Sequence, residues 1–470
     1  MSVSTSSEAL ASGSVSTTNA CRMCMPLGAG LAFSGFEGTV PFLHGSQGCA
    51  TYIRRYLISH FSEPMDIASS SVGEAATVFG GEANLREGVR NVTRVYRPEM
   101  IGVATTCLTE TIGEDVSGML GRMGPPEERT APDGTPGPAL VHVPTPSYAG
   151  THADGFHAAV TSTVTALARP ASDGSVPGAS DGSVNVLPGI VSTADLRHLR
   201  ELVAGYGLAP RLMPDWSDRL DGVSMDHYEM LTAGGTPLTE VAASGAAAAS
   251  ITLGGLVSPG ITLAGDLLAE SFGVPHHRLA MPVGIRLTDA LTDRLTDLSD
   301  RPMPDWSAAE RGRLIDAYVD GHKYVAERTA VVYGDEDLVL GLAVWLAEIG
   351  ITPAVCATGG RSGRLAAEIA RLAPELDGRV EVVEDTDFRR IGEAARRIRP
   401  DLLIGHSKGY RLARELDIPL VRVGLPIHDR VGAQRVRHLG YRGAQELFDR
   451  VANTLIADRQ DSSSVGYAYM

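Results

Sequence analysis

The last third of the chain alternates short apolar runs with longer amphipathic segments, and this alternation restricts the possible fold more than any other feature. The pattern predicts strands over 329–333, 352–357, 380–383, 402–404 and 420–423. Helices are predicted between them over 338–349, 362–372 and 389–398. Strands joined through helices run parallel, and the helices then cover both faces of the sheet. Ligand sites of such sheets lie at the carboxyl ends of the strands.

The same alternation extends upstream in a less regular form. Strands are predicted over 100–106, 139–143, 186–191 and 249–253, and a helix over 195–206. A chain of 470 residues is also too long for a single domain. The predicted fold class is therefore α/β, with the parallel unit repeated along the chain.

Composition indicates where the units are divided. The N-terminus is rich in Ser, Thr, Ala and Gly, and the sequence SDGSV occurs twice between 172 and 184; both features are typical of solvated, flexible segments. The predicted divisions are a flexible arm over 1–19, an α/β domain over 20–170, a linker or loop over 171–185, a second α/β domain over 186–326, a third, Rossmann-like domain over 327–458 and a tail over 459–470.

Charge and motif content exclude several classes of function. A net charge of −15 argues against nucleic acid as a partner. No apolar run reaches the roughly 18 residues that cross a bilayer, and the N-terminus lacks the pattern of a signal peptide, so we expect a cytoplasmic protein. Neither of the lysines, Lys323 and Lys408, follows a glycine-rich turn as a P-loop requires, and no clean Gly-x-Gly-x-x-Gly opens a helix. If the reaction consumes ATP, another protein binds it.

The cysteines are the strongest candidates for chemistry. They are Cys21, Cys24, Cys49, Cys107 and Cys356, an odd number that argues against a disulfide framework in the cytoplasm. Cys24, Cys49 and Cys107 each lie on a glycine-rich loop or at a strand end, where backbone can approach a cofactor closely. Three thiolates from separate loops suit an iron–sulfur cluster. Taken singly, each can also be a small buried hydrophobe, which is how we interpret Cys356 within its apolar strand.

Cys21 and Cys24 together form a Cys-x-x-Cys pair, which is compatible with a zinc knuckle or a redox pair. A zinc knuckle would need a second cysteine pair, and a thioredoxin-like motif would open a helix after a strand. Here the pair follows the predicted arm. We therefore interpret Cys21 as a bystander.

Several runs around these cysteines resemble the beta-type chain of the nitrogenase component 1 family. The runs are 24–28, 44–49, 105–115, 145–150, 404–408 and 423–430. The resemblance covers nearly the whole chain after the arm and implies three Rossmann-like α/β domains. It also implies that Cys24, Cys49 and Cys107 hold one side of an 8Fe-7S P-cluster-type iron–sulfur cluster, shared with an alpha-type subunit in an α2β2 heterotetramer.

The resemblance carries three further residues over to this chain. Ser147 matches a serine that can ligate the oxidised cluster in some members of the family. Tyr52 matches a residue on the route from this cluster to the active-site cofactor, and Phe79 matches an aromatic residue where the ATP-hydrolysing iron protein docks. For Tyr52 and Phe79, ordinary core packing is the alternative.

The implied mechanism is electron relay. The iron protein hydrolyses ATP and delivers an electron to the shared cluster, and the substrate is reduced at a second metallocluster housed mainly in the alpha-type partner. This chain contains no complete acid–base site, and we interpret His44, His60 and His152 as structural histidines.

Three hypotheses about the particular activity follow from the resemblance. The complete set of three cysteines argues against a non-catalytic cofactor-assembly scaffold. The Cys21-x-x-Cys24 pair, Arg54 with Arg55, and the tail 464–470 resemble nitrogenase-like reductases such as the methylthio-alkane reductases, which cleave C–S bonds. We place that activity first, dinitrogen reduction by a nitrogenase beta chain second and the scaffold third.

Overall fold

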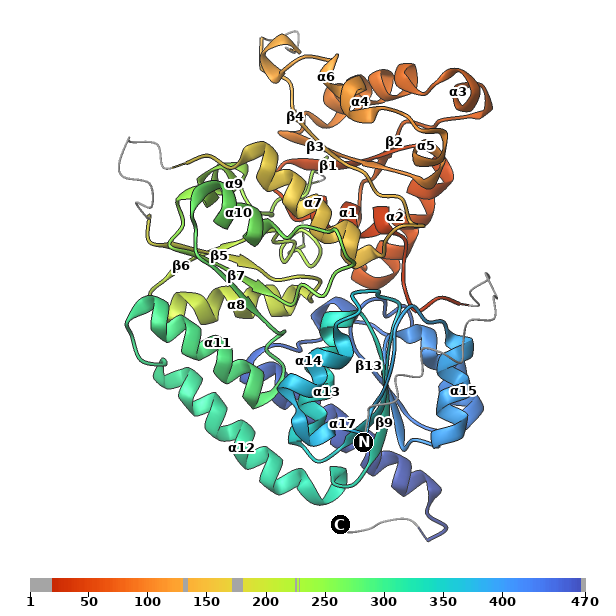
Figure 1. Ribbon diagram of the computed structural model, residues 1–470, viewed down its shortest axis with the longest axis vertical. Coiled ribbons are helices and arrows are strands. Elements are labelled where there is room, and N and C mark those ends of the chain that lie inside the picture. The colour runs from red at the N-terminus through yellow and green to blue at the C-terminus, as the bar shows by residue number, and fades with distance from the viewer. Residues whose placement is uncertain (1–18, 130–133, 171–180, 225, 228, 466–470) are drawn as a thin grey trace.

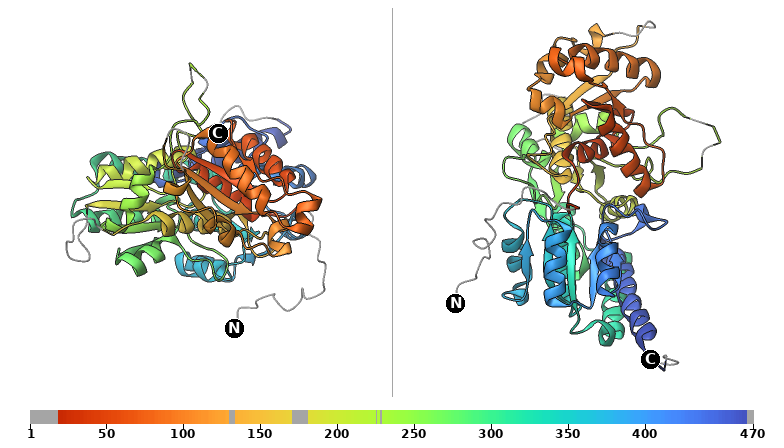
Figure 2. Two further views of the ribbon diagram at one scale, coloured as in Figure 1. Left: turned by 90° about the horizontal axis from the view of Figure 1, so that it is seen from above. Right: turned by 90° about the vertical axis from the view of Figure 1, so that its right-hand side faces the viewer.

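The computed structural model of the chain describes residues 19–129, 134–170, 181–224, 226–227 and 229–465. Its strands form three sheets in which all neighbouring strands are parallel. This confirms the predicted α/β class with three helix-flanked parallel sheets. The first unit lies at one end of the long axis and the third at the other (Figures 1 and 2). The predicted arm lies outside the described residues except for its last residue, Asn19.

The first sheet has the strand order β2-β1-β3-β4. Its strands are β1 (Thr39–His44), β2 (Ala68–Ser69), β3 (Met100–Thr105) and β4 (Ala139–Val143). β1 and β3 are buried along their whole length, as expected for central parallel strands. Their last residues, His44 and Thr105, lie opposite each other. The helices of this unit are α1 (Met25–Ser34), α2 (Gln47–Phe61), α3 (Glu74–Phe79), α4 (Glu82–Tyr96), α5 (Cys107–Ile112), α6 (Val116–Gly121), the 3-10 turn η1 (Pro126–Glu128) and α7 (His152–Leu167).

Two glycines bring α1 and α7 into close contact. A Cβ atom on Gly28 of α1 would lie 1.7 Å from the carbonyl oxygen of His152, and one on Gly155 of α7 would lie 2.0 Å from the carbonyl oxygen of Met25. Only glycine permits this approach of one backbone to the other. The contact fixes the start of α1, where Cys24 lies, against the start of α7.

The second sheet has the strand order β6-β5-β7-β8. Its strands are β5 (Ser183–Leu187), β6 (Ala209–Leu212), β7 (Ala249–Leu253) and β8 (His276–Leu279). β5 begins inside the predicted linker, so the segment 171–185 is not all linker; residues 171–180 lie outside the described residues. The helices here are α8 (Thr193–Gly205), α9 (Leu238–Ala243), η2 (Ser244–Ala246), α10 (Ala264–Phe272), α11 (Gly284–Ser299) and α12 (Asp305–Val325).

The third sheet has the strand order β11-β10-β9-β12-β13 and contains every strand predicted for this region. Its strands are β9 (Thr329–Gly334), β10 (Thr352–Thr358), β11 (Glu381–Val383), β12 (Leu402–Gly405) and β13 (Leu420–Arg422). Its helices are α13 (Glu336–Glu348), α14 (Leu365–Leu372), η3 (Pro374–Leu376), α15 (Phe388–Ile398), η4 (Ser407–Gly409), α16 (Tyr410–Leu416), η5 (Ala433–Arg435) and α17 (Gly440–Ser462). α17 continues into the predicted tail, so the segment 459–470 begins as helix; residues 466–470 lie outside the described residues.

The three units share one large core. The main cluster of buried apolar side chains includes Phe33 of the first unit, Leu199 of the second and Trp345 of the third. The short N-terminal segment 19–23 also links two units, because it precedes α1 in the chain but pairs with the third unit through an antiparallel bridge between Ala20 and Asp387. No helix in the described part of the chain is both long and apolar enough to cross a membrane.

Candidate metal centre

The ends of β1 and β3 bring two of the three predicted thiols together. α2 begins just after β1 and carries Cys49 in its first turn, whereas α5 begins just after β3 with Cys107 as its first residue. The two strands are parallel neighbours that end side by side. Cys49 and Cys107 therefore lie at the carboxyl edge of the first sheet, where ligand sites of parallel sheets are found.

Cys24 approaches this edge from the N-terminal cap position of α1. Burial raises the pKa of the Cys24 thiol to about 11, and the charges of Cys49 and Cys107 add to the rise, whereas the backbone N–H of Leu27 opposes it. Burial and the charge of Cys107 likewise raise the pKa of Cys49. Like charges shift a pKa in this way only when they are close together. The structure thus brings the three predicted cysteines within range of one another's charge.

The thiol group is open on one side. Cys24 and Cys49 are half-buried and Cys107 is exposed. Within the described residues, no three His, Cys, Asp or Glu side chains converge tightly enough to enclose a single metal ion. These thiols therefore do not form a closed zinc site, whereas sulfur donors from three separate elements suit an iron–sulfur cluster.

Ser147 lies on the loop after β4, the next strand along the same sheet. Its hydroxyl accepts a hydrogen bond from the backbone N–H of Met25 at 3.2 Å, so it contacts the residue that follows Cys24. The same loop is tied to β3, because the backbone N–H of Thr145 donates to the hydroxyl of Thr105 at 2.7 Å. The loop after β4 therefore lies beside the site that the ends of β1 and β3 form.

The two aromatic candidates are both outside the core. Tyr52 lies one turn after Cys49 with 55% of its surface exposed, and the charge of Cys24 contributes to the raised pKa of its phenol, after burial. Tyr52 therefore borders the thiol group. Phe79 ends α3 with 87% of its surface exposed, beside the exposed Val78. Ordinary core packing, the alternative for both residues, is thereby excluded.

The three histidines have structural partners. The ring of His44 bonds Ser70 through Nδ1 at 2.9 Å and Glu114 through Nε2 at 2.7 Å, and burial lowers its pKa. His60 and His152 are also buried, with pKa values lowered by burial to about 3 and about 4. They remain neutral at physiological pH and hold backbone in place.

The other two cysteines lie apart from the site. Cys356 is fully buried in β10, as expected for a small apolar residue. The Cys21 side chain packs into a core cluster of the third unit, and its Sγ lies 3.8 Å from Nε2 of His406. Burial raises the pKa of the Cys21 thiol to about 12. Lys408 lies near Cys21, and no role in the site was predicted for it from the sequence. It could have been singled out, because it is one of the two lysines of the chain and lies in a run that carries the family resemblance.

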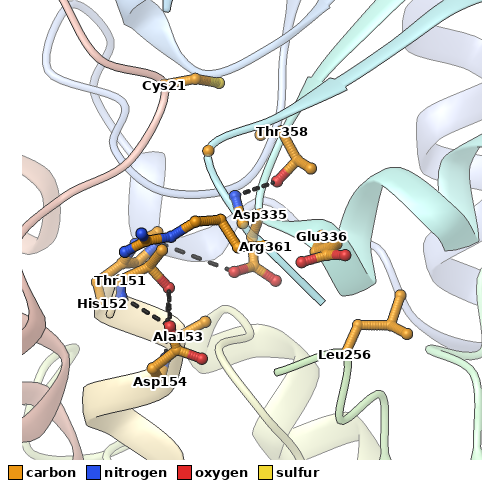
Figure 3. A pocket seen from close by; sticks show the side chains of 13 residues that line it. Cys21, Thr151, His152, Ala153, Asp154, Leu256, Asp335, Glu336, Thr358 and Arg361 are labelled. Atoms are coloured by element: carbon orange, nitrogen blue, oxygen red, sulfur yellow. Dashed lines mark hydrogen bonds and ion pairs between the residues drawn. The ribbon is translucent and has the colours of Figure 1, made fainter. Parts of the chain in front are cut away.

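A small cavity between the three units is not a second site for a metallocluster. Figure 3 shows its lining, in which His152 and Asp154 of α7 face Asp335 and Glu336 at the end of β9, with Arg361 between them. Its volume of about 10 Å³ holds no more than one water molecule. Some of the lining polar groups contact each other, as His152 and Asp335 do at 3.9 Å, whereas Nε and one terminal nitrogen of Arg361 are buried without a hydrogen-bond partner in the described part of the chain.

Three parallel α/β units with thiols gathered at a strand edge define the class of an α/β protein with a candidate thiolate metal site. The family model described as "Nitrogenase component 1 type Oxidoreductase" matches residues 24–456. The chain belongs to this family, which confirms the predicted enzyme class of oxidoreductase subunit.

Named relatives are beta chains. The chain is 36% identical over 444 residues to the nitrogenase molybdenum-iron protein beta chain of Methanothermobacter marburgensis, with 93% of each chain covered. It is 33% identical to the corresponding chain of Clostridium pasteurianum, covering 93% of each, and 34% identical to the nitrogenase vanadium-iron protein beta chain of Trichormus variabilis, again covering 93% of each. These matches confirm the predicted beta type.

A solved structure titled "Nitrogenase Cp1 at pH 6.5" superimposes with a TM-score of 0.91 at 31% identity, covering 97% of each chain. Another, titled "Nitrogenase Cp1 at pH 5", has a TM-score of 0.67 at 14% identity, which is a likeness of fold alone. The three-unit architecture is therefore that of nitrogenase component 1.

Proposed function

We propose that this chain is the beta-type subunit of a nitrogenase-like reductase, in which Cys24, Cys49 and Cys107 hold one side of a P-cluster-type iron–sulfur cluster. The observation that carries the proposal is the gathering of these thiols, from three separate elements, at the carboxyl edge of the first sheet. Cysteine sulfur is the usual ligand of iron in such clusters.

Two of these sulfurs lie at helix starts, whose stabilisation of negative charge is outweighed by burial while the thiols are free of metal. Cys24 caps α1 and Cys49 lies in the first turn of α2, where the free backbone N–H groups and the helix dipole stabilise negative charge. Without metal, the raised pKa values keep both thiols protonated at neutral pH. Iron bound by these sulfurs would take the place of the thiol protons, so cluster binding would release protons.

The open side of the site indicates where the alpha-type partner binds. The exposed Cys107 needs a cover, because a thiolate-bound cluster left in solvent is prone to oxidation. A second polypeptide that supplies ligands of its own covers the cluster and completes its coordination, as expected for an α2β2 heterotetramer. Ser147, whose hydroxyl contacts the residue after Cys24, would be a further ligand for the oxidised form of the cluster.

The exposed aromatic side chains fit an electron relay. When bound, the cluster accepts electrons from an ATP-hydrolysing iron protein and supplies them to the second metallocluster of the partner. Phe79 and Val78 form an exposed apolar tip on α3, a surface for transient protein docking. Tyr52 is exposed and borders the thiols, so it would be a candidate for the route by which electrons leave the cluster.

The substrate that we place first is a methylthio-alkane, with reductive cleavage of its C–S bond. The Cys21-x-x-Cys24 pair, Arg54 with Arg55 and the C-terminal tail support this assignment. Dinitrogen reduction is the second candidate, favoured by the names of relatives that are 33–36% identical. An assembly scaffold comes third, because the set of three thiols is complete.

One experiment separates these activities. The chain is copurified with its alpha-type partner subunit, analysed for iron and assayed with the iron protein, ATP and a reductant. Ethylene or methane from methylthio compounds, without ammonia from dinitrogen, supports the first assignment. Ammonia from dinitrogen refutes it in favour of the second, and a transferable cluster without any turnover identifies a scaffold.

A further inference from the structure

The N-terminal strap, residues 19–23, connects the third unit to the start of α1. The backbone N–H of Cys21 donates to the carbonyl of Thr386 at 3.1 Å, and the N–H of Phe388 donates to the carbonyl of Asn19 at 3.2 Å. Cys24 follows the strap directly. The third unit therefore holds the segment that presents Cys24 to the thiol site of the first unit.

Lys408 reinforces this attachment. It lies in η4, just after β12, and its ammonium donates hydrogen bonds to the carbonyl oxygens of Ala20 at 3.0 Å and Arg22 at 3.4 Å. These two carbonyls flank Cys21 in the strap. The ammonium also lies 5.8 Å from the centre of the Tyr56 ring, on the helix that carries Cys49. Lys408 thus contacts both the strap and α2.

The charge of Lys408 has no carboxylate partner within the described residues. Its ammonium bonds only carbonyl oxygens there, in a half-buried position. A cation withdrawn from water without an anion is unfavourable. Burial accordingly lowers the pKa of Lys408, and the sulfurs of Cys21 and Cys24, when ionised, oppose that shift. The negative charge that this cation lacks would be provided by a thiolate-ligated cluster at Cys24.

We infer that Lys408 is a positioning residue, which fixes the strap that carries Cys24 and places a permanent positive charge beside the Cys24 side of the cluster. The inference rests on the proposed cluster. A nearby positive charge stabilises the reduced form, which carries one more electron, and so raises the reduction potential. Loss of the charge makes the midpoint potential more negative, and loss of the hydrogen bonds loosens the strap.

The test compares three variants of the purified heterotetramer with the wild type. Lys408→Met removes the charge at nearly constant length, Lys408→Arg keeps it, and Lys323→Met makes the same chemical change at the other lysine, exposed on α12. A potentiometric titration of the cluster, followed by electron paramagnetic resonance, should give a more negative midpoint for Lys408→Met. Lys408→Arg and Lys323→Met should match the wild type.

A second measurement does not need the cluster. In complex purified from iron-limited cells, hydrogen exchange at the amides of Cys21 and Phe388 should be faster in Lys408→Met than in Lys323→Met. If Lys408→Met fails to bind iron while Lys408→Arg binds it, no midpoint can be measured for Lys408→Met. The loss of iron then itself shows that the cluster needs a positive charge at position 408. An unchanged midpoint with unchanged exchange overturns the inference, as does equal loss of iron from both Lys408 variants with unchanged exchange. Iron missing from the wild type refutes the proposed cluster, and the exchange measurement then still tests the strap.

Discussion

The close contact between α1 and α7 gives a prediction that tests how the fold positions Cys24. Gly28→Ala would place a Cβ atom 1.7 Å from the carbonyl oxygen of His152. Since C···O contacts are ordinarily about 3.3 Å or longer, the helices would have to separate by about 1.6 Å. The carbonyl oxygen of His152 is a backbone atom, so no change of side-chain rotamer relieves the clash.

The change in the free energy of unfolding caused by Gly28→Ala follows from two opposing effects. Overpacking in a close-packed interior costs about 1–3 kcal/mol, and alanine recovers about 0.5–1 kcal/mol through its higher helix propensity. Because the clash is with backbone, we take the upper end of the overpacking cost, which leaves a net destabilisation of about 2 kcal/mol for Gly28→Ala. Gly30→Ala on the same helix is a matched control, because nothing lies within 4 Å of its Cβ position. That variant should be neutral or slightly stabilised.

Urea unfolding followed by tryptophan fluorescence measures the difference. Trp216 is a suitable reporter, since its ring packs edge-on against Phe156 of α7 at 5.6 Å. Gly28→Ala should lower the unfolding midpoint and also reduce the iron bound per complex, although no ligand is changed. Equal midpoints and equal iron contents for the two variants would refute the packing argument.

Three further predictions concern docking, protonation and the link between the second and third units. Phe79→Ala should change the free energy of unfolding by no more than about 0.5 kcal/mol and leave the iron content unchanged, because the ring is 87% exposed. The variant should nevertheless be reduced more slowly by the iron protein and ATP. An unchanged reduction rate would exclude Phe79 from docking. In complex purified from iron-limited cells, alkylation of Cys24 should keep accelerating as pH rises towards its pKa of about 11, and a plateau near pH 8.5 would contradict the burial and the neighbouring charges. Asp195→Asn should destabilise the protein by about 1–3 kcal/mol in urea unfolding, since this buried carboxylate accepts bonds from the His438 ring at 3.0 Å and from the Leu439 N–H at 2.9 Å; a cost below 1 kcal/mol would show that this link contributes little.

Much of the fold was predictable because central strands of parallel sheets are continuous apolar runs. β3, β7, β9, β10 and β12, each flanked by strands on both sides, were predicted to within a few residues on this basis. β1 was not predicted as a strand, and it contains Pro41. The proline is accommodated because β2 pairs with β1 only from Phe42 onward. β8 was missed because an edge strand with the sequence His-His-Arg-Leu has no apolar pattern.

The site was only partly predictable. Cys49 and Cys107 follow neighbouring strands, so their approach follows from the parallel topology itself. The place of Cys24 depends on the glycine contact between α1 and α7, and the role of Lys408 depends on a hydrogen bond between residues 388 positions apart. Contacts of this kind arise from tertiary packing, and local sequence patterns do not encode them.

The measurement that tests the central claim most directly is the iron content and redox signal of the complex carrying Cys49→Ala, compared with Cys356→Ala. Cys356 is a matched control, being a buried cysteine in the third sheet away from the site. Cys49→Ala should lose iron and the cluster signal while circular dichroism shows the α/β fold intact, and Cys356→Ala should keep both. Full iron and an unchanged signal in Cys49→Ala would contradict the account.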